Sequence, residues 1–96
     1  MTAVAIEELC AMLNEQLAQG VRDRIELKVV GESGLAVRVA GENCLTSISV
    51  WPNGSCDVDL LYASSELGEF RHFEFQSTEA AVAAVLYEIT SAVERA

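Results

Sequence analysis

Four acidic and imidazole side chains in the second half of the chain have a spacing that could hold a metal ion. Asp57 and Asp59 form a D-x-D pair, and His72 and Glu74 form an H-x-E pair. Residues two apart on a strand point to the same face, so the pairs would converge if their strands are neighbours. The same spacing is common on any solvated strand face, and no further residues that would orient ligands accompany it. A divalent metal site is therefore one alternative for these residues.

The cysteines and the single histidine do not form a catalytic pattern. Cys10, Cys44 and Cys56 are odd in number and widely spaced, without a CxxC or Cys/His arrangement, which is typical of reduced packing residues. Cys44 and Cys56 fall at inward positions of predicted strands and His72 at an outward one, so they are not expected to form a nucleophile and base pair. GxSxG, Gly-rich phosphate-loop, HExxH and EF-hand motifs are absent from the sequence. We therefore expect no catalytic residues and no cofactor.

Length and composition predict one folded domain over residues 1–96. Hydrophobic residues make up 51% of the chain, which is enough for a core and argues against disorder. No segment has the roughly 20 consecutive apolar residues of a membrane span. Glu7 and Glu8 stand where a signal peptide would be apolar, so we expect a cytoplasmic location.

Net charge indicates the kind of partner. Fifteen acids against six bases give −9, and residues 49–96 hold eight of the acids and only two of the bases. This charge disfavours nucleic acid and anionic membrane as partners and favours a basic protein. An acidic surface that serves only solubility is the alternative.

Two helices are predicted at the ends of the chain. Thr2 can cap a first helix that Gly20 ends, and Ser77 or Thr78 can cap the last, with Glu79 in its first turn. Each carries one narrow apolar stripe at helical spacing, which is typical of packing on a sheet. The stripes are Ile6, Leu9, Cys10, Leu13 and Leu17 in the first helix, and Val82, Val85, Leu86, Ile89 and Val93 in the last.

Five strands are predicted between the helices. Alternating apolar residues give each strand one inward face, and short turn segments at 31–34, 41–43 and 63–68 predict an antiparallel meander. The expected fold class is α+β, a two-layer α-β-β-β-β-β-α arrangement with both helices on one face of the sheet. The inward set is Ile25, Leu27 and Val29; Leu35, Val37 and Val39; Ile48 and Val50; Val58, Leu60 and Tyr62; Phe73 and Phe75.

The strongest turn signal lies in mid-chain. Pro52 presets the first turn position, Asn53 tolerates the second, and Gly54 can take the left-handed conformation that closes a three-residue hairpin loop. This turn orients the side chains of both flanking strands, so Trp51 and Asp57 should project from the same outward face. A Trp beside a tight turn either packs down over its neighbours or serves as an exposed interface anchor.

The outward face of the sheet should be a shallow platform with small residues in its middle, bases on the first strands and acids on the last. Its alternative is an ordinary solvated surface with cross-strand ion pairs such as Glu26 with Arg38. Loop lengths predict which outward residues lie opposite one another on successive strands, and each such set forms a row across the sheet. The first row is Lys28, Ala36, Ser49, Asp57 and Glu74, and the second is Glu26, Arg38, Ser47, Asp59 and His72. The third row is more apolar and contains Arg24, Ala40, Leu45, Leu61 and Phe70. Trp51, with Val30 and Ser55, should lie at the opposite end.

Two segments resemble the TriTu family of bacterial immunity proteins. The run from Leu45 to Asp57, LTSISVWPNGSCD, is similar to the family's strand that ends in Trp, its short Asn-Gly or Ser-Gly turn and the acidic start of its next strand. The run from Glu69 to Phe75, followed by Ser77-Thr78-Glu79, is similar to its His-containing last strand and capped final helix. The resemblance covers roughly residues 25 to 93. It departs from the family pattern at Arg71, where an acid is expected, and in the weakly charged loop 63–68.

This resemblance implies an immunity protein, or antitoxin, of a bacterial polymorphic toxin system. Such a protein neutralises a secreted toxin by tight non-covalent binding and needs no catalysis. It would act as a monomer or weak homodimer on a basic toxin domain. The alternatives are an acidic secretion chaperone, which should be a stable homodimer, and the small metal-binding protein considered above. The expected partner-binding residues are Trp51, Asp57, Asp59, His72 and Glu74, with Glu66 and Glu69 on the rim.

Overall fold

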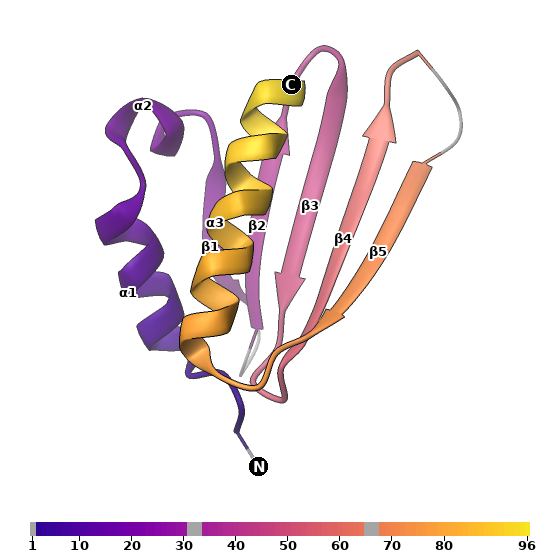
Figure 1. Ribbon diagram of the computed structural model, residues 1–96. Helices are drawn as coiled ribbons and strands as arrows, with labels where there is room; N and C mark the ends of the chain where they lie inside the picture. The colour runs from indigo at the N-terminus through magenta and orange to yellow at the C-terminus, as the bar shows by residue number, and fades with distance from the viewer. Residues whose placement is uncertain (1, 31–33, 65–67) are drawn as a thin grey trace.

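The computed structural model describes residues 2–30, 34–64 and 68–96. It confirms the predicted α+β class: an N-terminal helix, a five-stranded antiparallel sheet and a C-terminal helix (Figure 1). A short additional helix precedes the first strand. The elements are α1 (Ile6–Gln16), α2 (Gln19–Arg22), β1 (Glu26–Val30), β2 (Gly34–Ala40), β3 (Cys44–Val50), β4 (Ser55–Tyr62), β5 (Gly68–Glu74) and α3 (Thr78–Arg95).

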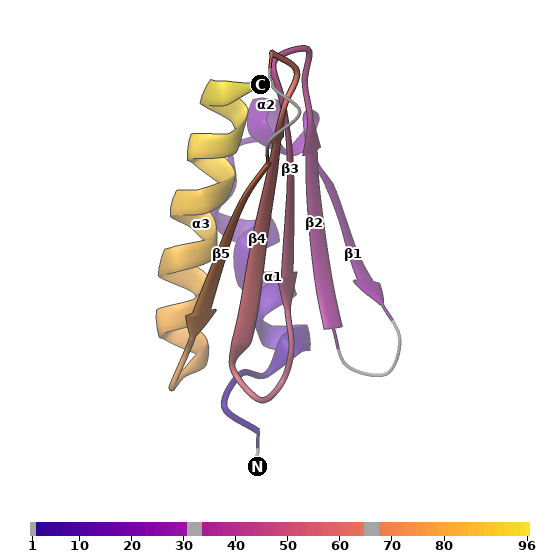
Figure 2. The ribbon, with the colours of Figure 1, turned by 90° about the vertical axis from the view of Figure 1, so that its right-hand side faces the viewer.

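The sheet is a simple meander. Its strands follow the order β1-β2-β3-β4-β5, and every neighbouring pair is antiparallel. Both long helices lie on one side of this sheet, and Figure 2 shows the other side left bare. The turns predicted at 31–34 and 63–68 fall largely outside the described residues.

The core lies between the helices and the central strands. Apolar positions of α1 and α3 pack onto alternate residues of β2, β3 and β4, as the period-2 pattern predicts. Val29 lies on the helix side, as predicted, opposite the buried Leu35. It is nevertheless 52% exposed, because β1 is an edge strand that the helices cover only in part. The largest fully buried side chains are Leu9, Leu13, Leu35, Ile48, Leu60 and Ile89.

The first helix is shorter than predicted at both ends. It begins at Ile6 rather than beside Thr2, and its N-cap position, Ala5, has no side-chain cap. Residues 3 and 4 are not helical. Their N–H groups donate instead to the carbonyl of Pro52 in the β3–β4 turn, at 2.8 Å from Ala3 and 3.0 Å from Val4. Gly20 lies within α2 and does not end α1. A local capping rule therefore fails where a long-range backbone bond is available.

Ser77 caps the last helix as predicted. Its hydroxyl oxygen accepts a hydrogen bond from the N–H of Ala80 at 3.1 Å. The neighbouring Thr78 has another role, because its Oγ1 accepts from the N–H of Ala5 at 3.0 Å. Both helices thus begin at the same end of the molecule, held by one side chain.

The mid-chain turn has the predicted conformation. Gly54 has φ of 97°, and among the described residues it alone has positive φ. The loop closes through a bond from the Gly54 N–H to the Trp51 carbonyl at 3.0 Å and one from the Trp51 N–H to the Ser55 carbonyl at 2.9 Å. The side-chain oxygen of Asn53 also accepts from the Ser55 N–H at 2.9 Å. The Pro-Asn-Gly sequence is thus explained by the turn alone.

The fifth strand is shifted by two residues from the predicted rows. Asp57 lies opposite His72 rather than Glu74, and Asp59 lies opposite Phe70. The shift follows from the N–H of Phe75, which donates to the carbonyl of Gly54 at 2.8 Å and sets the start of the β4–β5 ladder at the turn itself. The pairs within β1 to β4 agree with the predicted rows. The prediction is wrong for Arg24, which was placed opposite Ala40 but lies in the turn before β1.

Candidate functional site

The candidate site is the side of the sheet that the helices leave bare, called the open face here. Its members are the outward side chains of the five strands, together with Trp51, which strand alternation places on the same side of the β3–β4 turn. The outward strand residues include Glu26, Lys28, Ala36, Arg38, Leu45, Ser47, Ser49, Asp57, Asp59, Leu61, Phe70, His72 and Glu74.

An imidazole held between two carboxylates is the centre of the acidic half of the open face. His72 Nδ1 lies 2.6 Å from an Asp57 carboxylate oxygen on the neighbouring strand. His72 Nε2 makes a short contact with the Glu74 carboxylate, two residues along the same strand. Asp59 is the diagonal neighbour of His72 on β4 and is exposed. The structure therefore brings together four of the predicted partner-binding residues.

These hydrogen bonds favour the protonated imidazole. Those to Asp57 and then to Glu74 raise the pKa of His72 above its usual value of 6.5. In the protonated form both ring nitrogens of His72 donate to these carboxylates, and the imidazolium partly neutralises their charge.

This geometry does not suit a metal ion. A histidine ligand must offer a neutral ring nitrogen, and both nitrogens of His72 contact carboxylates. Across residues 2–30, 34–64 and 68–96, no group of three or more His, Cys, Asp or Glu side chains is placed to hold a metal ion.

The other half of the open face is basic and hollowed. Lys28 and Arg38 are exposed on β1 and β2, and Glu26 lies directly opposite Arg38. Small side chains on β2 and β3 leave a hollow of about 300 Å³ between these charges and the acidic strands. The predicted polarised platform is thus present in the structure, with Ala36, Ser47 and Ser49 at its middle.

Three large hydrophobic residues are exposed on the open face. Trp51 is 39% exposed at the end near the β3–β4 turn. Leu61 and Phe70, 55% and 59% exposed, are diagonal neighbours at the other end, beside the half-buried Leu45. The sequence pattern placed Leu61 and Phe70 in an apolar row but did not single them out as contacts. Their signal was an apolar residue at an outward position of a strand.

Glu69 does not belong to this site. Leu60, its partner on β4, is buried against the helices, so Glu69 points to the helix side of the sheet. There the Tyr62 hydroxyl donates to its carboxylate at 3.4 Å. Its expected place on the rim of the acidic cluster is therefore wrong, because alternation puts residues 69 and 72 on opposite faces. The predicted rim residue Glu66 lies outside the described residues.

Arg71 and Glu88 form an ion pair that the sequence analysis missed. Arg71 also points to the helix side, where its two terminal nitrogens donate to the two Glu88 carboxylate oxygens at 2.8 and 3.3 Å. The Glu88 side chain is only 7% exposed, and that of Arg71 is 35% exposed. A buried carboxylate needs a cation, and Arg71 supplies it for Glu88.

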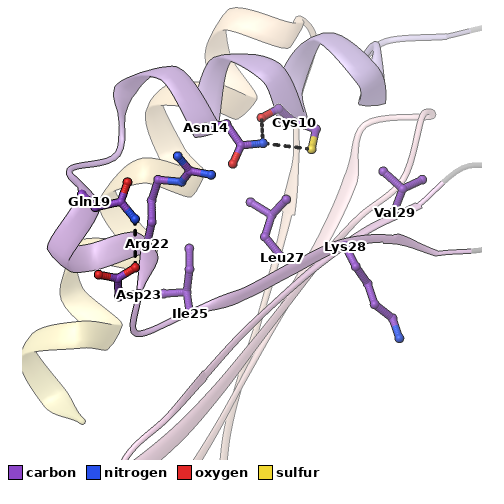
Figure 3. Close-up of a pocket in the computed structure, with 9 residues that line it drawn as sticks. All are labelled: Cys10, Asn14, Gln19, Arg22, Asp23, Ile25, Leu27, Lys28 and Val29. Carbon is purple, nitrogen blue, oxygen red and sulfur yellow. Dashed lines mark hydrogen bonds between the residues drawn. The ribbon is translucent and has the colours of Figure 1, made fainter.

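A second hollow, of about 390 Å³, lies between α1, α2 and β1 (Figure 3). Three of its polar side chains make hydrogen bonds: Asn14 donates to the Cys10 carbonyl at 3.0 Å, and Gln19 donates to Asp23 at 2.9 Å. Lys28 points away from the helices in this view. We place the candidate site on the open face instead, because Trp51, Asp57, Asp59, His72 and Glu74 of the predicted partner-binding set lie there.

The cysteines are free thiols, as predicted. Cys44 and Cys56 are buried in the core, and Cys10 is half-buried. Burial, with smaller effects of Asp57 and Glu88, raises the pKa of Cys56 to about 12, so its thiol is protonated at neutral pH.

No family model, curated protein or solved structure matches this chain. The resemblance to the TriTu family therefore stays a prediction based on the motifs quoted above.

Proposed function

We propose that this chain is an immunity protein that binds and neutralises a cognate secreted bacterial toxin through the open face. The binding is non-covalent, and the partner is a toxin domain with a basic surface. The proposal rests on the TriTu-like motifs and on the chemistry of the open face.

The exposed hydrophobic residues carry the proposal. Trp51 at one end and Leu61 with Phe70 at the other place large apolar side chains in water on the same face. Interfaces are centred on such side chains, with polar groups around them. An ordinary solvated sheet face has no need of them. The open face therefore has the composition of a protein-binding surface.

The charges indicate a basic partner. Asp57, Asp59 and Glu74 lie between the apolar ends, and of these Asp57 and Glu74 both contact His72. Such carboxylates can accept hydrogen bonds from Arg or Lys side chains of a nuclease-like cleft and can steer its approach. The chain's net charge of −9 acts in the same direction and makes nucleic acid and anionic membranes poor partners. Among the described residues, no helix is long and apolar enough to span a bilayer.

The test is binding to the product of the neighbouring gene, which we expect to be a large exported polypeptide with a variable C-terminal toxin domain. The pair should co-purify as a one-to-one complex. Replacing Asp57 and Asp59 together by Ala should weaken the complex about 100-fold, because two charge-assisted contacts are lost. The matched control is E7A/E8A, which removes two exposed acids from α1 and changes the net charge equally.

Three outcomes would contradict the proposal. Unchanged affinity of D57A/D59A would exclude the acidic half of the open face. Equal weakening by E7A/E8A would show a nonspecific charge effect. A stable homodimer that binds an extended effector segment would instead identify the secretion chaperone.

A further inference from the structure

The water-facing surface of α3 is unusually poor in charge. Between Glu79 and Glu94, its exposed side chains are Ala80, Ala83, Tyr87 and Thr90, which are all uncharged. Glu88, the one charged residue in this stretch, is buried against Arg71. A helix face that meets only water normally carries charged residues, and 22% of this chain is charged. The composition of this helix face is typical of a contact surface.

A groove continues this surface toward the edge of the sheet. It has a volume of about 300 Å³ and lies between α3 and β5, with Ala84 and Tyr87 on the helix side. Phe73 and Phe75 line the strand side, their ring centroids 6.3 Å apart in a stacked arrangement. Tyr87 is 68% exposed at its rim, and Cys56 is buried at its base. The groove thus offers aromatic walls to an apolar side chain, and the Arg71–Glu88 ion pair forms the charged part of its lining.

The groove exists because two helices cannot cover five strands. Strands lie about 4.8 Å apart and packed helices about 10 Å apart, so each helix covers about two strands. In Figure 1, α1 and α3 stand over the first part of the sheet, while β5 extends beyond α3. The uncovered strip is on the opposite side of the sheet from the open face, so it is separate from the surface proposed for the toxin.

We propose that α3 and this groove bind an amphipathic helix of a partner protein whose apolar stripe has a Lys or Arg at each end. The small residues Ala80, Ala83 and Ala84 allow close helix packing, and the groove would receive one large apolar side chain. Glu79 and Glu94 lie at the two ends of the uncharged stretch and would pair with the basic ends of the partner helix.

A second copy of the chain fits this surface poorly. Packing α3 on α3 in a parallel pair puts Glu79 near Glu79 and Glu94 near Glu94, and an antiparallel pair puts Glu79 near Glu94. Either arrangement adds like-charge repulsion to two bodies that each carry −9. The charges therefore favour a basic partner over self-association.

The proposal can be tested with a designed 18-residue helical peptide, roughly the length of α3, with a Leu/Ala stripe and Lys at both ends. Amide NMR shifts of the whole chain should change at residues 73–75 and 80–90 on titration. Ala83→Glu should weaken binding about tenfold or more, because it places a charge in the middle of the contact. The matched control is Ala11→Glu, the same substitution at an exposed position of α1, and it should leave the affinity unchanged.

Other results would overturn the proposal. Equal binding of a peptide with Glu at both ends would exclude the role of Glu79 and Glu94. Shifts confined to the open face, or no shifts at millimolar peptide, would exclude the surface. A dimer in light scattering that A83E dissociates would identify a second copy as the occupant. D57A/D59A should bind the peptide with unchanged affinity. The helix-binding proposal and the toxin-binding proposal can therefore fail independently of each other.

Discussion

Gly54 should be the least replaceable residue of the β3–β4 turn. Its φ of 97° is strained for any residue with a Cβ, and a Cβ built there overlaps the carbonyl oxygen of Phe75. That carbonyl belongs to the segment joining β5 to α3, and the Phe75 N–H donates to the Gly54 carbonyl at 2.8 Å. Substitution at Gly54 therefore disturbs the turn and the start of the β4–β5 ladder together.

The loss of stability in Gly54→Ala can be estimated as the sum of the backbone strain and the weakened hydrogen bond to Phe75. Left-handed backbone in a residue with a Cβ costs about 1 to 2 kcal/mol. Moving Phe75 away weakens a backbone hydrogen bond worth about 1 kcal/mol. The free energy of unfolding should fall by about 2 to 3 kcal/mol, which lowers the Tm of a domain this size by roughly 10 to 20 °C. Urea denaturation followed by circular dichroism measures this change.

Two further variants separate strain from contact. Gly20→Ala is the matched control, because a Cβ there meets no atom within 4 Å and the residue lies in α2. It should leave stability unchanged or raise it by up to about 1 kcal/mol. Gly54→Asn tolerates the left-handed conformation but keeps the overlapping Cβ, so it should remain destabilised. A loss below about 1 kcal/mol in Gly54→Ala, or full recovery in Gly54→Asn, would refute the contact with Phe75.

Two other predictions concern charged side chains. Arg71→Met should lower the free energy of unfolding by about 2 kcal/mol, less than for a fully buried pair because Arg71 is partly exposed. The double variant R71M/E88L should recover most of this loss in urea denaturation, and equal loss in both would show that the two side chains are not coupled. The raised pKa of His72 means that the folded state holds this proton more tightly than the unfolded chain. Its contribution is fully present below about pH 6.5 and is lost as pH rises through the raised value, so wild-type stability should decline over that window relative to His72→Gln. The free energy of unfolding of both proteins should be measured from acidic to mildly alkaline pH. A constant difference between wild type and His72→Gln across that range would contradict the prediction.

The local patterns were reliable where each element is decided by its own neighbours. The Ser77 cap, the Pro-Asn-Gly turn and the alternation that buries Val37 and Val58 all depend on residues a few positions apart. The start of α1 could not be predicted this way, because the N–H groups that Thr2 would have helped to cap bond instead to Pro52, about 50 residues away. Turn chemistry and periodicity contain no information about such a partner.

Some features of the candidate site could likewise be predicted from the sequence, and others depend on tertiary contacts. The sequence by itself determined that Asp57 and Asp59 face away from the helices, since a period of two fixes the face of each side chain even when the register slips by two residues. The register predicted from loop lengths agrees with the structure for β1 to β4. Only the tertiary structure decided that Asp57 meets His72, because the Gly54–Phe75 hydrogen bond sets the register of β5 across a longer connection. It also decided that Arg71 and Glu88 pair, since whether a helix carboxylate meets a strand cation depends on how the layers pack.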